Sequence, residues 1–160
     1  MKQKTDSAKS RAIWDRVQQA NAQSSGASPA EPVLTPERLL WLTWRNSLAY
    51  RQLGKLTRDR QARTLLHRLE RSAWQQHRTL QVLWMTRMGA MFPVPPGEAP
   101  VCRSLLQGCT RLLRQEQQNK AAFLALGGET PELQTQFQEL ADRAAAHAAV
   151  LQRLIGRILR

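Results

Sequence analysis

The fold is decided by residues 131–158, PELQTQFQELADRAAAHAAVLQRLIGRI. One series through this stretch has members spaced three or four apart, and most of them are apolar: Leu133, Phe137, Leu140, Ala144, His147, Leu151, Leu154 and Ile158. Because an α-helix has 3.6 residues per turn, this series forms a single face. The stretch is therefore predicted to be an amphipathic helix whose apolar face must be covered by other parts of the chain.

Three further helices are predicted upstream. The first begins after Thr35, a favourable N-cap residue that is followed by proline, and Gly54 is expected to end it. The second covers residues 58–88, where apolar residues again recur every three or four positions. The third covers about 101–125, and the sequence Gly127-Gly128-Glu-Thr-Pro131 is expected to break it.

A proline-rich segment separates these helices into two pairs. Residues 91–100, MFPVPPGEAP, hold four prolines and a glycine, so no helix is expected to cross them. No stretch shows the alternation that is typical of a strand. The predicted fold is all-α: an antiparallel four-helix bundle, built from two helical hairpins and covering residues 33–160.

Composition excludes several classes of protein. The chain has 160 residues, of which 42% are hydrophobic, and only two cysteines, so a disulfide-stabilised mini-protein is excluded. No segment approaches the roughly 18 apolar residues of a membrane span, and no signal peptide is recognisable, so a cytoplasmic location is expected. Residues 1–32 are predicted to be a flexible tail. Within it, Ile13, Trp14 and Val17 form an apolar patch that is expected to bind a partner.

Three polar residues interrupt the apolar faces of the predicted helices. His77 and His147 lie in the middle of the second and fourth helices, and Glu116 lies on the third. The two halves of the chain also resemble each other, since the first and third helices each carry one aromatic residue near their ends, Tyr50 and Phe123. The hairpins are therefore interpreted as two copies of one ancestral unit.

This layout resembles the ferritin-like superfamily, in particular the small rubrerythrin-like proteins, over residues 35–158. In that family a glutamate precedes an aromatic residue by seven positions on helices one and three, and Glu116 before Phe123 has this spacing. The matching position before Tyr50 is Thr43, which is not a metal ligand of the family. The resemblance therefore implies that one carboxylate of a di-metal centre is missing.

The second family motif, Glu-x-x-His on helices two and four, is also incomplete. Residues 74–77 read WQQH and residues 144–147 read AAAH, so both histidines are present and both glutamates are absent. The resemblance implies a di-metal site that keeps His77, Glu116 and His147 and lacks most of the negative charge that two ferrous ions need. If these residues belong to one core, their side chains should converge near the middle of the bundle.

These residues lead to one expected function and two alternatives. The expected function is non-catalytic binding or assembly, with no cofactor, through a protein partner or self-association. The first alternative is a rubrerythrin-like protein, possessing oxidoreductase activity if it is an enzyme, that binds iron or zinc through His77, Glu116 and His147. The simplest role for these residues is structural: a buried hydrogen bond between Glu116 and a histidine.

Charge suggests the chemistry of the partner. Lys and Arg number 24 against 12 Asp and Glu, which gives a formal net charge of +12. On a helical wheel, five arginines of the second helix lie together and away from its apolar face: Arg60, Arg63, Arg68, Arg71 and Arg78. Such a face attracts an acidic partner. The second alternative is a basic, nucleic-acid-associated bundle, although no nucleic-acid-binding motif is present.

Overall fold

The computed structural model describes residues 34–93 and 100–160, and these residues confirm the prediction of an all-helical protein. Their four α-helices are α2 (Pro36–Leu56), α3 (Arg60–Met88), α4 (Leu105–Glu129) and α5 (Gln134–Ile158), and a short 3₁₀ turn, η1 (Pro131–Leu133), precedes α5. No strand occurs in either described range. The predicted tail with Ile13, Trp14 and Val17 lies outside the described residues.

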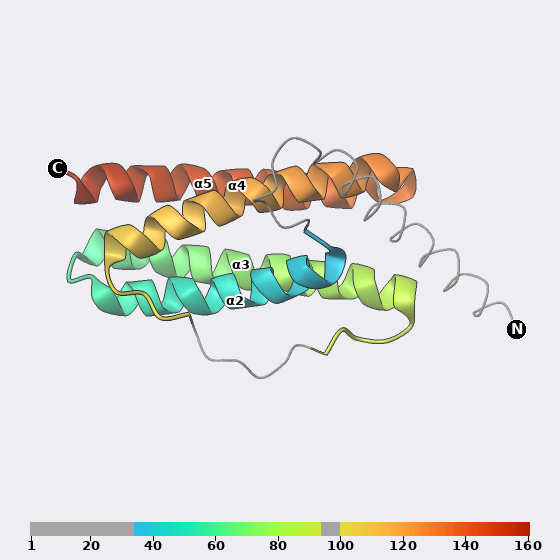
Figure 1. The fold of residues 1–160 in the computed structure, drawn as a ribbon, viewed down its shortest axis with the longest axis horizontal. Coiled ribbons are helices and arrows are strands. Elements are labelled where there is room, and N and C mark those ends of the chain that lie inside the picture. The colour runs from blue at the N-terminus through green and yellow to red at the C-terminus, as the bar shows by residue number, and fades with distance from the viewer. Residues whose placement is uncertain (1–33, 94–99) are drawn as a thin grey trace, which may run out of the picture.

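The helices lie alongside one another in two pairs (Figure 1). The most extensive contacts are those of α2 with α3 and of α4 with α5. The pairs meet where α2 contacts α4 and where α3 contacts α5. Each helix therefore packs against two others around a shared interior, as in a helical bundle. Within the described part of the chain, no helix has the length and apolarity that crossing a membrane requires.

Side-chain caps explain where three helices begin. The Thr35 hydroxyl accepts a hydrogen bond from the Arg38 N–H at 3.1 Å, as its N-cap sequence predicts. Asp59 caps α3 by accepting from the Gln61 N–H at 2.9 Å. Ser104 caps α4 by accepting from the Gln107 N–H at 3.1 Å, so α4 begins at Leu105 and later than expected.

Glycines end fewer helices than the sequence suggests. The prediction that Gly54 ends the first helix is wrong, because α2 continues to Leu56. The predicted break over residues 127–131 is confirmed, since α4 ends at Glu129, although both glycines lie within the helix. Both positions keep helical backbones, and Gly127 packs closely on α5, where an added Cβ would lie 3.2 Å from Phe137 Cβ. Thr130 makes no side-chain cap, and the helical segment that leads into α5 begins with the 3₁₀ turn at Pro131.

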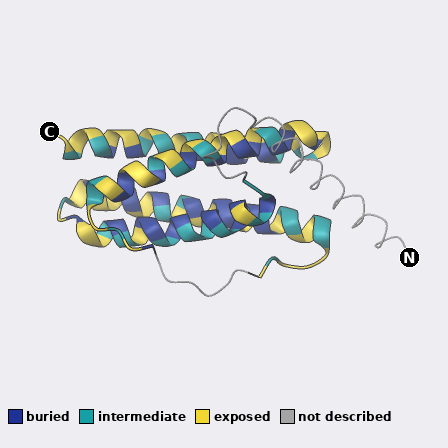
Figure 2. Cartoon of the chain, viewed as in Figure 1, coloured by how far each residue is buried: buried dark blue, intermediate teal, exposed yellow. Residues whose placement is uncertain are grey.

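The buried residues form two apolar clusters with a polar layer between them. One cluster contains Leu40, Phe123 and Phe137, and the other contains Leu53, Leu66 and Leu151. On every helix, buried polar residues lie between the members of the two clusters: Thr43, Asn46 and Ser47 on α2, Gln76 and His77 on α3, Glu116 and Asn119 on α4, and His147 on α5. Gln81 of α3 is also buried but lies beyond Leu80 of the first cluster. Figure 2 shows the buried positions of the helices directed toward the interior.

Candidate functional site

The polar layer contains one chain of hydrogen bonds that passes through all four helices. The Tyr50 hydroxyl on α2 donates to Glu116 Oε1 on α4 at 2.6 Å. The same oxygen lies 3.1 Å from Nδ1 of His147 on α5. The other ring nitrogen of His147, Nε2, lies 2.7 Å from the Ser72 hydroxyl on α3. These hydrogen bonds, called here the four-helix network, link the two helix pairs.

The environment of Tyr50 fixes the direction of its hydrogen bond. Burial raises the pKa of the Tyr50 hydroxyl well above its usual value, and the negative charge of Glu116 raises it further. The hydroxyl therefore keeps its proton at neutral pH and donates a hydrogen bond to Glu116 Oε1. A carboxylate oxygen only accepts, so Nδ1 of His147 donates to the same oxygen, and Nε2 lies at hydrogen-bond distance from the Ser72 hydroxyl.

His77 lies in a separate part of the polar layer. Its Nδ1 is 3.0 Å from the backbone carbonyl of Leu40 and 3.1 Å from the Thr43 hydroxyl. Since a carbonyl can only accept, Nδ1 carries the proton. Thr43 also donates to the Leu40 carbonyl, at 3.1 Å. The indole of Trp74 stacks on the imidazole with 5.5 Å between ring centroids. Burial lowers the pKa of His77, and the hydrogen bond to Leu40 partly opposes this effect.

The two halves of the bundle pair their histidines in the same way. Thr43 lies 3.1 Å from Nδ1 of His77, and Glu116 Oε1 lies 3.1 Å from Nδ1 of His147. Thr43 and Glu116 each precede an aromatic residue by seven positions. Only the Glu116–His147 pair is extended across the bundle, because Glu116 also accepts a hydrogen bond from the Tyr50 hydroxyl. Phe123, the counterpart of Tyr50 in the other half, has no hydroxyl. The sequence spacing thus corresponds to a spatial repeat of polar–histidine pairs.

The chain was also compared with known proteins. No family model, curated protein or solved structure matches it. The chemistry of the site therefore has to be judged from its own geometry.

The polar layer does not fit a metal ion. Among residues 34–93 and 100–160, no group of three or more His, Cys, Asp or Glu side chains is placed to hold one. Glu116 and His147 meet, but His77 directs its protonated Nδ1 at Leu40 instead of joining them. Glu116 Oε2 is buried without a partner and could bind a cation, yet the other two orphaned atoms, the amide nitrogens of Asn46 and Asn119, are donors.

The four-helix network also resembles a hydrolase triad in its order of groups. Ser72, His147 and Glu116 supply a hydroxyl, an imidazole and a carboxylate within hydrogen-bond distance. A triad additionally needs donors that hold the developing oxyanion. Ser72 lies well inside α3, where backbone N–H groups donate within the helix. The arrangement therefore supports cohesion of the helices better than catalysis.

The five arginines of the predicted basic face are all exposed on α3. In the described part of the chain, none of them forms an ion pair with a carboxylate. Glu70, the one acidic residue of α3, pairs instead with Arg51 on α2 at 2.7 Å. The positive charge of this face is thus not neutralised by the bundle itself.

Sequence reasoning missed Tyr50 and Ser72 as members of the network. Tyr50 was recognised only as an aromatic counterpart of Phe123, although the hydroxyl that distinguishes the two is a signal for a buried hydrogen bond. Ser72 carried no signal, because a serine on a helix is usually solvated. Its role depends on which residue of α5 lies beside it.

Proposed function

We propose that this chain is a non-catalytic binding or assembly protein, with an antiparallel ferritin-like bundle in which hydrogen bonds replace the metal centre. The matched pairs Thr43–His77 and Glu116–His147 support the ferritin-like repeat. Ferritin-like bundles hold their metals between facing helices in the bundle core, where this chain has its polar layer. Here Tyr50 and Ser72 add hydrogen bonds to one pair, so the layer joins helices, and Glu116 Oε2 is the carboxylate oxygen of that pair left without a partner among the described residues.

The partner we propose is an acidic polypeptide surface that binds the arginine face of α3. The observation that carries this proposal is that Arg60, Arg63, Arg68, Arg71 and Arg78 are exposed on one helix without a carboxylate partner in the described residues. Arginine presents five N–H donors in a planar fork that matches carboxylates. A partner rich in Asp and Glu would supply the missing charge.

Binding of fluorescent polyglutamate to the full chain tests this proposal. We expect saturable binding that weakens as salt is raised, because exposed charges are screened. Replacing Arg68, Arg71 and Arg78 by glutamine should weaken binding by about tenfold at low salt, since the variant removes the centre of the complementary patch.

The matched control removes the same charge elsewhere. Arg103, Arg114 and Arg153 are also exposed, but they lie outside α3. Their replacement by glutamine should change the affinity less than twofold. Equal losses in both variants would mean that net charge alone attracts the polymer. Tighter binding of single-stranded RNA than of polyglutamate at equal salt would favour the nucleic-acid alternative.

Metal analysis tests the non-catalytic part of the proposal. After chelator washing and reconstitution with ferrous iron or zinc, the protein should retain less than one metal ion per chain, because too few ligands converge. Stoichiometric metal that depends on Glu116 would support the rubrerythrin-like alternative instead.

A further inference from the structure

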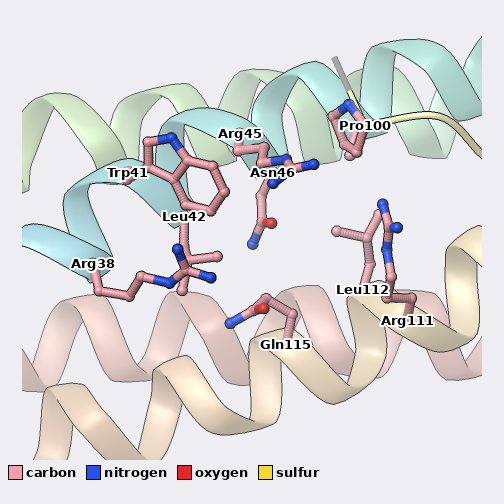
Figure 3. Close-up of a pocket in the computed structure, with 10 residues that line it drawn as sticks. Arg38, Trp41, Leu42, Arg45, Asn46, Pro100, Arg111, Leu112 and Gln115 are labelled. Atoms are coloured by element: carbon pink, nitrogen blue, oxygen red, sulfur yellow. The ribbon is translucent and has the colours of Figure 1, made fainter. Parts of the chain in front are cut away.

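A second positive feature lies between α2 and α4, away from the arginine face of α3. It is a half-open cavity of about 170 Å³, and its polar lining includes Arg38, Arg45 and Asn46 on α2 and Arg111 on α4. We call it the arginine groove (Figure 3). None of the described residues that line it is acidic. An anion that entered it would therefore meet three positive charges and no carboxylate, alongside apolar side chains such as Trp41 and Leu112.

Two of the arginines are held in place by one indole. The guanidinium carbon of Arg38 lies 4.4 Å from the centroid of the Trp41 ring, and that of Arg45 lies 4.6 Å from it. These residues are three and four positions from Trp41, so one face of α2 presents all three. Cation–π contacts restrict the guanidinium groups before any ligand binds, which lowers the entropy lost on binding.

The groove also contains a buried donor without an acceptor. Asn46 is only 5% exposed, yet its Nδ2 has no hydrogen-bond partner in the described structure. Figure 3 shows the Asn46 amide projecting from α2 toward α4, near Gln115. Buried polar groups are nearly always satisfied by the protein or by ordered water, so this unpaired amide beside the groove is a donor that needs an acceptor.

The charges of the lining have no partner within the protein either. In the described ranges, neither Arg38, Arg45 nor Arg111 makes an ion pair with a carboxylate. Within the described ranges, the Arg111 guanidinium donates a long hydrogen bond of 3.9 Å to the Cys102 sulfur. Three guanidinium groups and one amide therefore face a small space that lacks negative charge.

We propose that the arginine groove binds the phosphate group of a small phosphomonoester. Such a group carries close to two negative charges at neutral pH and has three terminal oxygens, which suits several separate donors. A carboxylate has one charge and two oxygens. A water molecule occupies about 30 Å³ in the liquid, so a cavity of about 170 Å³ admits a phosphate and the atoms next to it. The remainder of the molecule would lie in the open mouth.

Calorimetric titration of the full chain tests the proposal with four ligands. Phenyl phosphate, a monoester, is expected to bind more than tenfold more tightly than benzoate, because it has the additional charge and oxygen. Inorganic phosphate tests whether the free ion is bound equally well. A short single-stranded RNA without terminal phosphates, which presents only diesters, tests whether a nucleic-acid backbone is the source of the phosphate.

Paired variants locate the binding site. Replacing both Arg45 and Arg111 by glutamine should weaken phenyl phosphate binding at least tenfold, because both sides of the groove lose a charge. The matched variant R58Q/R153Q removes the same charge from exposed positions outside both the groove and the arginine face, and should change affinity less than twofold. Circular dichroism and thermal unfolding establish that both variants fold.

Several outcomes would overturn the proposal. These are no heat of binding for phenyl phosphate at millimolar concentration, equal weakening in the two variants, or equal affinity for benzoate. If the RNA binds more tightly than the monoester and only R45Q/R111Q weakens it, the ligand is a nucleic-acid backbone and the proposed monoester is wrong. None of these results depends on whether polyglutamate binds to α3, so the groove and the arginine face are tested separately.

Discussion

Two histidines with similar positions in sequence have different chemical surroundings. His147 has both ring nitrogens within hydrogen-bond distance of side chains, Glu116 and Ser72. His77 directs one nitrogen to a backbone carbonyl and lies under the indole of Trp74, with no carboxylate at hydrogen-bond distance. Burial without a negative neighbour disfavours imidazolium, which explains why the pKa of His77 is lowered.

This lowered pKa predicts a dependence of stability on pH. The ordinary pKa of histidine, about 6.5, applies to the unfolded chain, so between that value and the folded pKa the unfolded state binds more protons. Stability from neutral His77 is complete above about pH 6.5 and is lost as the pH falls toward the folded pKa. His77→Asn keeps an N–H near the position of Nδ1 but cannot titrate, so the unfolding free energy of this variant should fall less than that of the wild type between pH 7 and pH 5.

Gln75, an exposed residue of α3 that does not titrate, provides the control for this measurement. Gln75→Asn should leave the pH dependence of denaturant unfolding as it is in the wild type. If the stability of His77→Asn fell as steeply as that of the wild type when the pH was lowered, protonation of His77 would not be the cause of the wild-type loss.

At the scale of elements, a glycine on α4 allows close packing against α2. A Cβ added to Gly108 would overlap Leu53 of α2 and would lie 3.3 Å from the Cys102 sulfur. Gly128 is also on α4, but an added Cβ there meets nothing within 4 Å. The two glycines therefore have different reasons to be present, although both lie in one helix.

Substitution by alanine should separate these roles. Gly108→Ala is expected to lower the free energy of unfolding by about 1–3 kcal/mol, because α4 must move away from α2 or Leu53 must change rotamer. Gly128→Ala, the matched control, should raise it by up to about 1 kcal/mol through helix propensity. Chemical denaturation of both variants gives the comparison. Stabilisation by Gly108→Ala would contradict the close contact described here.

At the scale of the whole molecule, the core is divided. Two apolar clusters lie on either side of the polar layer, and the four-helix network crosses that layer. Buried hydrogen bonds of this kind contribute little net energy when complete but are costly to break, because the groups left behind are desolvated. The network therefore specifies how the helix pairs fit together more than it adds to total stability.

Removal of the Tyr50 hydroxyl should reveal this role. Tyr50→Phe leaves the buried Glu116 Oε1 with one donor fewer, and we expect the unfolding free energy to fall by about 1–3 kcal/mol. Gln138→Ala removes a hydrogen bond to Asp142 that is exposed to solvent and should cost less than about 0.5 kcal/mol beyond helix propensity. Equal effects in thermal unfolding would mean that the Tyr50–Glu116 bond does not join the helix pairs.

Local order along the chain determined the helices and several of their ends. The three-to-four spacing of apolar residues predicts α3 and α5 well, and Thr35 caps α2 as its sequence implies, because these features depend on neighbours within one or two turns. Gly54 misled the prediction of where α2 ends. Glycine is only mildly unfavourable inside a helix, and packing such as that of Gly127 on Phe137 can outweigh this preference.

Only the tertiary structure decided which side chains meet. Periodicity placed His77, Glu116 and His147 on inner faces, but it could not show that Glu116 would join Tyr50 and His147 while His77 would turn to Leu40. Tyr50 and Glu116 are 66 residues apart, and Ser72 and His147 are 75 apart. Contacts over such separations depend on the rotation and offset of each helix against its neighbours, which the packing of all four helices sets together.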